Sequence, residues 1–247
     1  MEKTPNFLLG LDGCKAGWIC SHQNQKNEWK FEIFPTIEKF WKRFSNIKLI
    51  LIDIPIGLRD KGMEPRLCDE LARKLLTRKR SSSIFPPPCR TALDADSYIK
   101  ANFINKKFTG KGLSKQSWNI CSKIREVDFL LRNNNIAREL FIESHPELCF
   151  TVLSGNKPMT YYKKSDDGIK ERLSVIEFYC KNSETTLKEI INQLSLKNLS
   201  IDDILDSWIL AIAASKGMGG INFIPINYEY DSKGLPMRMA IPKFGKL

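Results

Sequence analysis

The chain has 247 residues, 42% of them hydrophobic and 27% charged, which is ordinary for a soluble globular protein. No window approaches the roughly 20 apolar residues that a membrane span requires, so we expect no membrane partner. The formal net charge is +11, with 39 Lys and Arg residues against 28 Asp and Glu residues. This excess favours polyanionic partners, nucleic acid (DNA or RNA) first, although a lysine-rich genome composition would also produce it.

The chain is expected to work in the cytoplasm. Its N-terminus has no basic region followed by a long apolar region, which a signal peptide would show. Its seven cysteines include no CxxC pair and its two histidines are far apart, which argues against a zinc site and a disulfide framework. A reducing compartment is the simplest one for such a chain.

The first third of the chain predicts an α/β unit with the order β-β-β-α-β. Three strands are expected, at residues 6–12, 17–23 and 29–34. Thr36 can cap a helix over 37–44. The continuous apolar run at 47–57 is typical of a buried central strand, and because it follows a crossover helix we expect it to pair in parallel.

The rest of the chain predicts a helical insertion and a C-terminal hairpin within a single domain that spans residues 1–247. The insertion covers about 59–135, and its helices need the sheet to bury their apolar faces. The other expected elements are helices at 65–76 and 113–132, a strand at 138–145, helices at 146–155, 168–181, 184–194 and 200–217, and a hairpin at 221–242 with its turn at 231–234.

Acidic residues recur where these apolar elements end. Asp12 ends the first strand, Asp53 lies inside the most apolar strand, and Glu143 follows a later apolar run. Asp203 and Asp206 are three residues apart and therefore lie on neighbouring positions of the last long helix. Like charges gather at a buried edge only if a cation neutralises them, and Mg²⁺ or Mn²⁺ prefers carboxylate oxygen. The five acids are therefore candidate metal ligands.

Each acid also has a structural explanation. Asp12 with Gly13 can begin a hairpin turn, and Asp53 before Ile54 and Pro55 can be a turn or capping acid. Asp203 can complete a capping box, Asp206 can lie on the surface, and Glu143 can pair with Arg138. The set of five is a more specific signal than any of its members.

The order of elements and the placement of the acids resemble the ribonuclease H-like fold, and more closely its Holliday-junction-resolvase branch. Sequence motifs along residues 8–240 are similar to the domain of unknown function 429 family, described as predicted ribonuclease H-like nucleases. These motifs are GLDGCKAGW (10–18), IDIPIGL (52–58), RLCDELARKLL (66–76), RKRSSSIFPPPCR (78–90), GKGLSKQSW (110–118), IREVD (124–128), ESHPELCF (143–150) and DDILDSWILA (202–211).

The resemblance implies a ribonuclease H-like mixed sheet and a metal-dependent nuclease. The metal set that it implies is Asp12, Asp53, Glu143, Asp203 and Asp206. In classical ribonuclease H the second acid lies on the first helix, where this chain offers Glu38. Two ions about 3.5–4 Å apart, Mg²⁺ or Mn²⁺, would activate a water and stabilise the leaving oxygen of a phosphodiester.

Basic residues of the insertion are candidate contacts to nucleic acid. Residues 78–90 carry Arg78, Lys79, Arg80 and Arg90, and Lys111 lies between two glycines. Arg pairs with phosphate through two hydrogen bonds, and backbone N–H groups beside glycines can approach a phosphate. The same run can instead be a solvated loop packed on the insertion helices.

His145 is a further candidate, two residues from Glu143 on one face of the predicted strand. It can shuttle a proton or orient the attacking water. It can equally be a structural cap for the helix that starts at Pro146.

Two other function classes stay open. GLDG at 10–13 resembles the first phosphate loop of the actin and sugar-kinase phosphotransferases, and KGMGG at 216–220 is a candidate adenosine loop. That superfamily duplicates its core, whereas this chain shows one meander and one acid-bearing first strand. The other class is a non-catalytic nucleic-acid-binding module, against which the intact acids argue.

Overall fold

The protein is described from a computed structural model, which covers residues 6–194 and 196–244. The chain divides into two compact units, and each is described by itself. The first consists of Met1–Asp53, Leu140–Asn222 and Ala240–Leu247, and the second of Ile54–Glu139 and Phe223–Met239. The expectation of a single domain stays a prediction.

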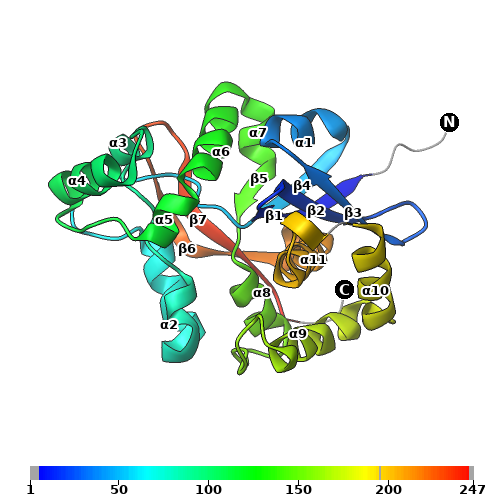
Figure 1. Cartoon of the computed structure of the whole chain (residues 1–247). Coiled ribbons are helices and arrows are strands. Elements are labelled where there is room, and N and C mark those ends of the chain that lie inside the picture. Colours follow the sequence, from blue (N-terminus) through cyan, green and yellow to red (C-terminus); the bar gives the residue numbers. More distant parts are fainter. Residues whose placement is uncertain (1–5, 195, 245–247) are drawn as a thin grey trace. The chain divides into compact units, whose positions relative to one another are not determined.

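The first unit is built on a five-stranded mixed sheet with the order β3-β2-β1-β4-β5 (Figure 1). β1 (Phe7–Cys14), β2 (Gly17–Gln23) and β3 (Trp29–Phe34) form an antiparallel meander. The helix α1 (Ile37–Arg43) then leads to β4 (Ile47–Ile52), which pairs in parallel with β1 and with β5 (Phe141–Glu143). The predicted β-β-β-α-β order is confirmed.

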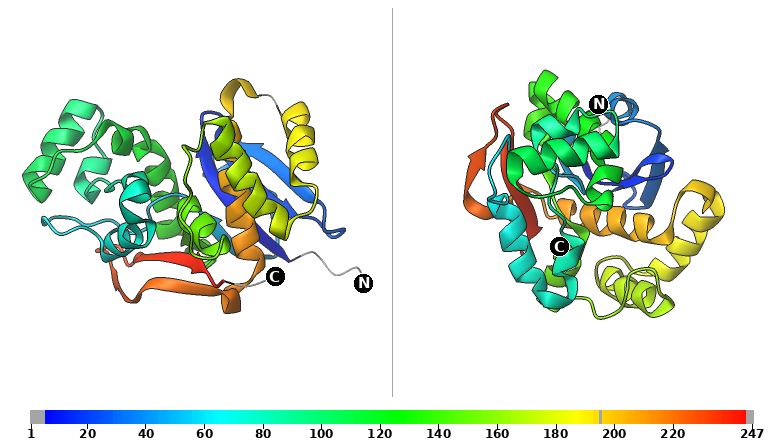
Figure 2. Two further views of the ribbon diagram at one scale, coloured as in Figure 1. Left: turned by 90° about the horizontal axis from the view of Figure 1, so that it is seen from below. Right: turned by 60° about the vertical axis from the view of Figure 1, so that its left-hand side comes forward.

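Four further helices complete the first unit. They are α8 (Pro146–Leu153), α9 (Asp166–Tyr179), α10 (Ser183–Gln193) and α11 (Ile201–Ser215). α11 packs against β1, β2 and β4, and α9 contacts both α11 and α10 (Figure 2). α11 lies deep in this unit, since its residues from Ile204 to Ala214 are all buried.

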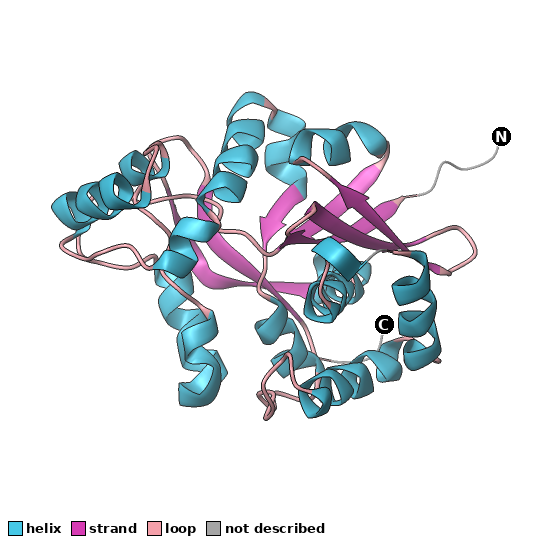
Figure 3. Cartoon of the chain, in the orientation of Figure 1, coloured by secondary structure: helices cyan, strands magenta, loops and turns pink. Residues whose placement is uncertain are grey.

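The second unit contains the predicted helical insertion and most of the predicted C-terminal hairpin (Figure 3). Its helices are α2 (Leu67–Arg80), α3 (Arg90–Leu93), α4 (Tyr98–Thr109), α5 (Lys115–Asn119), α6 (Cys121–Asn133) and most of α7 (Asn135–Leu140). The hairpin pairs β6 (Ile221–Tyr230) with β7 (Pro236–Pro242). No helix of the described chain has the length and apolarity that a membrane span needs.

Several elements in the middle of the chain differ from the predictions, among them β4, which ends at Ile52, and α2, which continues to Arg80. The strand predicted at 138–145 is only three residues long, because α7, capped at its start by Asn134, continues to Leu140. The helix predicted at 113–132 is divided at Ile120 into α5 and α6. α4 was not predicted, since its Ser97 cap and its left-handed Gly110 end delimit a helix with only two buried side chains.

Candidate active site

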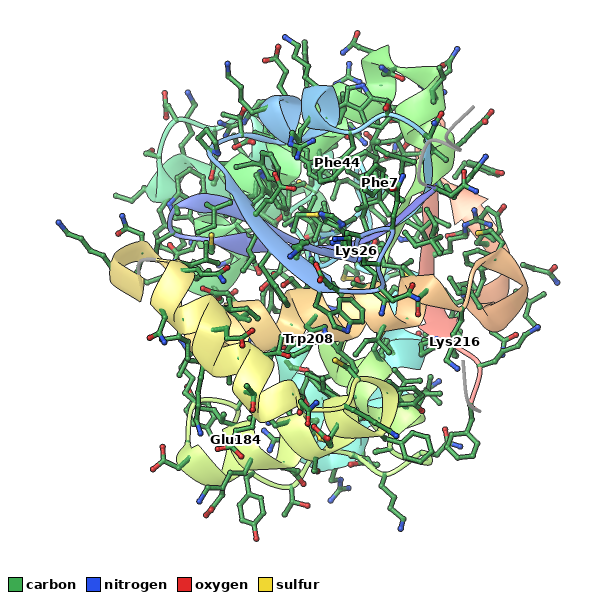
Figure 4. All side chains as sticks on the ribbon, turned by 90° about the vertical axis from the view of Figure 1, so that its right-hand side faces the viewer. Phe7, Lys26, Phe44, Glu184, Trp208 and Lys216 are labelled. Carbon is green, nitrogen blue, oxygen red and sulfur yellow. The ribbon has the colours of Figure 1, made fainter. Side chains whose placement is uncertain are left out.

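The close approach of β1 and α11 determines where the acids lie. At Gly10 a Cβ atom would stand 2.2 Å from the backbone nitrogen of Ala211 and 2.2 Å from the carbonyl oxygen of Ser207. The Ser21 hydroxyl of β2 donates to the same Ser207 carbonyl at 2.6 Å. Trp208 packs on Phe31 with ring centroids 5.3 Å apart, on the opposite side of the sheet from Phe7 and Phe44 (Figure 4).

Asp12 and Asp53 lie on the face of the sheet that α11 covers. Gly10 meets α11, and because side chains alternate along a strand, Asp12 points to the same face. The Asp53 amide donates to the Leu11 carbonyl at 3.0 Å and extends the pairing that places Leu11 opposite Ile52. Asp53 is therefore next to Asp12 on this face.

α11 adds three carboxylates from its first two turns. Asp206 is only 2% exposed, so the alternative of a surface position is wrong. Asp203 forms the capping box expected for it, because its Oδ2 accepts from the Ser200 amide at 2.9 Å. Asp202 is also buried, and the sequence analysis did not single it out.

The buried acids carry more negative charge than their surroundings neutralise. Burial raises the pKa of Asp12 well above its ordinary value, and the charges of Asp53, Asp206 and Asp203 raise it further. Burial also raises the pKa of Asp53, and raises that of Asp206 to about 6. A carboxyl whose pKa is raised by burial and by neighbouring acids is unfavourable in its charged form, so this group of acids favours either protons or a cation.

Lys163 supplies a positive charge to this group and was missed by the sequence analysis. Its Nζ lies 2.7 Å from Oδ2 of Asp206 and 3.1 Å from Oδ2 of Asp202. Burial opposes the charged ammonium, but the carboxylates of Asp206, Asp12 and Asp202 raise the pKa of Lys163 above its ordinary value. Lys164 is more distant, with its Nζ 3.7 Å from Asp202.

Hydrogen bonds and a close backbone approach hold the loop that carries Lys163 against the first half of α9. The carboxylate of Glu171 accepts from the Thr160 amide at 2.8 Å and from the Tyr161 amide at 3.0 Å. A Cβ at Gly168 would stand 1.8 Å from the Tyr162 carbonyl oxygen, so this approach requires glycine. These contacts join the residues just before Lys163 to α9, which follows it, and so hold the backbone at Lys163 in place.

A second buried ion pair borders the acids. Arg172 is fully buried and its Nε donates to Oε1 of Glu147 at 3.1 Å. The charge of Glu147 raises the pKa of both Asp53 and Asp206. Glu147 lies in the motif ESHPELCF, and a buried position in the first turn of α8 is the signal that could have identified it.

Three predicted candidates are placed differently from Asp12, Asp53 and Asp206. Glu143 is opposite Ile52, so strand alternation directs it to the other face of the sheet, together with Phe141. Glu38 is exposed and pairs with Lys42 at 2.5 Å. His145 follows β5 and caps α8, because its Nδ1 accepts from the Glu147 amide at 3.2 Å. The charge of His145 nevertheless lowers the pKa of Asp53, against the larger effect of burial.

The predicted basic residues of the second unit fall into two groups. Arg90 is buried and ion-paired to Asp128 and Asp231, which makes it structural rather than a surface contact. Arg78 is exposed just after a kink at Thr77. Arg80 is half-buried, and the side chain of Lys79 lies outside the described part. Lys111 is exposed and donates to the Met63 carbonyl at 3.1 Å.

The geometry places acids from β1, from the end of β4 and from α11 around one lysine, and comparison with known proteins identifies the family of the chain. Comparisons with curated proteins and with solved structures found no match. A family profile described as "Protein of unknown function (DUF429)" matches residues 10–229. Since this match covers most of the chain, the protein belongs to the DUF429 family.

Proposed function

We propose that the protein is a metal-dependent nuclease that hydrolyses phosphodiester bonds of nucleic acid. The observation that carries the proposal is the convergence of Asp12, Asp53 and Asp206, from three separate elements, on one buried face with insufficient positive charge. The sheet order β3-β2-β1-β4-β5 supports a ribonuclease H-like core, because that core requires a meander followed by parallel strands.

The donor set fits Mg²⁺ or Mn²⁺ in its chemistry. Hard divalent cations bind carboxylate oxygen, and Oδ1 of Asp206 is buried without a hydrogen-bond partner among the described atoms. In the described part of the chain no group of three or more His, Cys, Asp or Glu side chains has the arrangement of a metal site. The fit therefore rests on the residue types, on the unpartnered oxygen and on the shortage of positive charge.

Each residue has a defined task in this proposal. Asp12, Asp53 and Asp206 would hold the cation, which supplies Lewis-acid stabilisation and a bound water of lowered pKa. Asp203 adds negative charge beside Asp12 and keeps the start of α11 in place. Lys163 pairs with Asp202 and Asp206, and its ammonium would be available beside the cation for a substrate phosphate.

The phosphotransferase alternative has less support. It calls for two copies of the core, whereas the described residues contain one five-stranded sheet and one two-stranded hairpin. The candidate adenosine loop at 216–220 forms the short turn that joins α11 to β6.

Cleavage assays test the proposal with the wild-type protein and Asp12→Asn. The substrates are labelled single-stranded, duplex, hybrid and four-way-junction nucleic acids, each with Mg²⁺, Mn²⁺ or a chelator. We expect wild-type cleavage of at least one substrate with a divalent ion, no cleavage with the chelator, and a loss of at least 100-fold in Asp12→Asn. Equal cleavage by both proteins, or none by the wild type, would contradict the proposal.

A further inference from the structure

The second unit contains an open pocket of about 390 Å³ that is lined by this unit's own residues. Its lining comes from α3, from α6 and from the turn between β6 and β7. Its charged lining is four cations, Arg90, Arg125, Arg132 and Lys233, against two carboxylates, Asp94 and Asp128. Asp128 and Asp231 pair with Arg90, and the cations that remain, Arg125, Arg132 and Lys233, suit the pocket to an anionic ligand.

Arg90 is the buried cation of the pocket, and it is held by two ion pairs and keeps an unused donor. Arg90 is 8% exposed, and it donates to Oδ1 of Asp128 at 2.7 Å and to Asp231. Its Nε is buried without a hydrogen-bond partner among the described atoms. A buried guanidinium N–H without a partner is costly, so an acceptor from a ligand would be favourable there.

One face of α6 forms the wall. Arg125, Asp128, Phe129 and Arg132 are spaced so that they lie on the same side of the helix. Arg125 donates through Nε and Nη2 to the Leu93 carbonyl, at 3.3 and 2.7 Å. This contact fixes the guanidinium at the pocket and leaves Nη1 for a ligand.

The remaining positive charge is near solvent. Arg132 donates to Oδ2 of Asp128 at 3.3 Å and its side chain is 42% exposed. Lys233 is exposed, while its backbone amide donates to Oδ1 of Asp231 at 2.9 Å, which anchors the turn that presents it. Both side chains can therefore contact a ligand while the core packing stays intact.

Phe129 indicates that the ligand also has a flat, apolar part. Its ring is 68% exposed although it lines the pocket, so an apolar, flat surface lies beside the guanidinium groups. An Arg fork binds phosphate oxygens in pairs, and an exposed aromatic ring stacks on a nucleobase. A volume of about 390 Å³ is within the range of small-molecule sites.

We infer that this pocket is a nucleotide-binding subsite, in which Arg125, Arg132 and Lys233 bind a phosphate and Phe129 stacks on the attached base. The ligand is a free nucleotide or one nucleotide of a strand. This inference deepens the proposed nuclease function, because it names a contact to the same class of substrate. It assigns phosphate binding to residues other than the basic run at 78–80.

The inference is tested on the full chain by measuring its affinity for a labelled oligodeoxyadenylate of ten nucleotides. Fluorescence anisotropy reports the binding, and a chelator is present throughout. The variants are Arg132→Ala/Lys233→Ala and Phe129→Ala. The matched controls on α4 are Lys106→Ala/Lys107→Ala, which removes the same charge, and Phe103→Ala, whose ring is 69% exposed. Adenosine monophosphate and inorganic phosphate serve as competitors, and thermal melting verifies that each variant is folded.

We expect both pocket variants to bind the oligonucleotide about tenfold more weakly than their controls. The double variant should also lower the log–log salt slope by about 0.7 for each phosphate that the protein no longer binds. If adenosine monophosphate displaces the oligonucleotide, the site binds free nucleotides as well as strands. If it does not, the site binds only strands. If pocket and control variants bind alike, or the wild type does not bind, the inference is wrong.

The result of the binding experiment does not depend on whether the acids of the first unit bind a metal ion. Binding is measured without metal, so a protein that cleaves nothing can still show the pocket's effect. Conversely, cleavage that depends on Asp12 but not on the pocket variants would support the nuclease proposal and contradict this subsite.

Discussion

At the scale of single residues, Asp12 shows how burial and neighbouring charge act on one carboxyl. Its Oδ1 accepts from the Gly13 amide at 2.7 Å, which favours the charged form. Burial and three other acids act in the opposite direction and have the larger effect, since the pKa of Asp12 is raised. The folded protein without a cation is therefore destabilised when Asp12 is ionised.

Asp12→Asn is expected to stabilise the metal-free protein above neutral pH. Between the unfolded pKa of about 3.9 and the higher folded pKa, the native state binds more protons, so the stability of the wild type falls as pH rises. The variant lacks this decrease in stability. Its Tm should exceed that of the wild type at pH 8 by about 2–4 °C, the shift that about 1 kcal/mol produces in a chain of this size.

Thermal melts in chelator at pH 4 and pH 8 measure this difference. The gain should shrink towards pH 4, where Asp12 of the wild type is increasingly protonated. Glu189→Gln removes an exposed carboxylate of α10 and is the control, with little change expected at either pH. A variant less stable than the wild type at pH 8 would show that Asp12 already has sufficient positive charge.

At the scale of elements, the contact of β1 with α11 brings the acids together. Gly10→Ala would place a Cβ 2.2 Å from two backbone atoms of α11, and backbone cannot move aside as a flexible side chain can. We expect a loss of about 3 kcal/mol or more in the free energy of unfolding, at the upper end of the cost of overpacking. Urea denaturation measures it, with Gly219→Ala as the control, because a Cβ there meets nothing within 4 Å.

The loop before α9 is the second element that governs the acids. Lys163 places an ammonium 2.7 Å from Asp206, so it repels any divalent ion that the same carboxylate would bind. A divalent ion and an ammonium about 5 Å apart repel each other by about 7 kcal/mol at an effective dielectric constant of 20, and solvent reduces this value. Lys163→Gln should therefore bind Mn²⁺ about tenfold more tightly than the wild type.

Isothermal titration calorimetry with Mn²⁺ alone measures this affinity without reference to activity. Lys164→Gln is the matched control, since its ammonium is 3.7 Å from Asp202 and 55% exposed, and a smaller gain is expected. Equal affinities for the wild type and both variants would show that Lys163 does not compete with the cation.

At the scale of the whole molecule, the net charge of +11 sets the background for nucleic-acid binding. A diffuse excess strengthens binding to any polyanion, whereas a local cluster binds discrete phosphates. The triple variant Arg78→Ala/Lys79→Ala/Arg80→Ala should lower the salt slope for single-stranded DNA by about 0.7 for each phosphate that these side chains bind. The control removes the same charge from the first unit at Lys170, Lys181 and Lys188, which are exposed. Identical slopes for the two triple variants would show that only net charge matters.

The sequence by itself determined those elements whose apolar residues follow one regular pattern. The alternating run at 29–34 and the apolar run at 47–57 favour strands, and the long amphipathic segment after Ser200 favours a helix, so the meander, the crossover and α11 were predictable, although β4 ends at Ile52. The acids at 12, 53 and 206 could be identified for the same reason, because charge inside an apolar run is costly and stands out.

Tertiary structure alone decided which charges meet. Lys163 lies in a polar loop with no periodicity, and only the fastening of that loop to Glu171 and Gly168 brings its ammonium to Asp206. Glu143 has the composition of a site residue, but the register of β5 against β4 turns it to the other face of the sheet. Arg90 belongs to a basic run in the sequence, yet Asp128 and Asp231, which are distant in the chain, enclose it. Register and long-range pairing depend on the packing of segments that are far apart in sequence, and no local pattern records them.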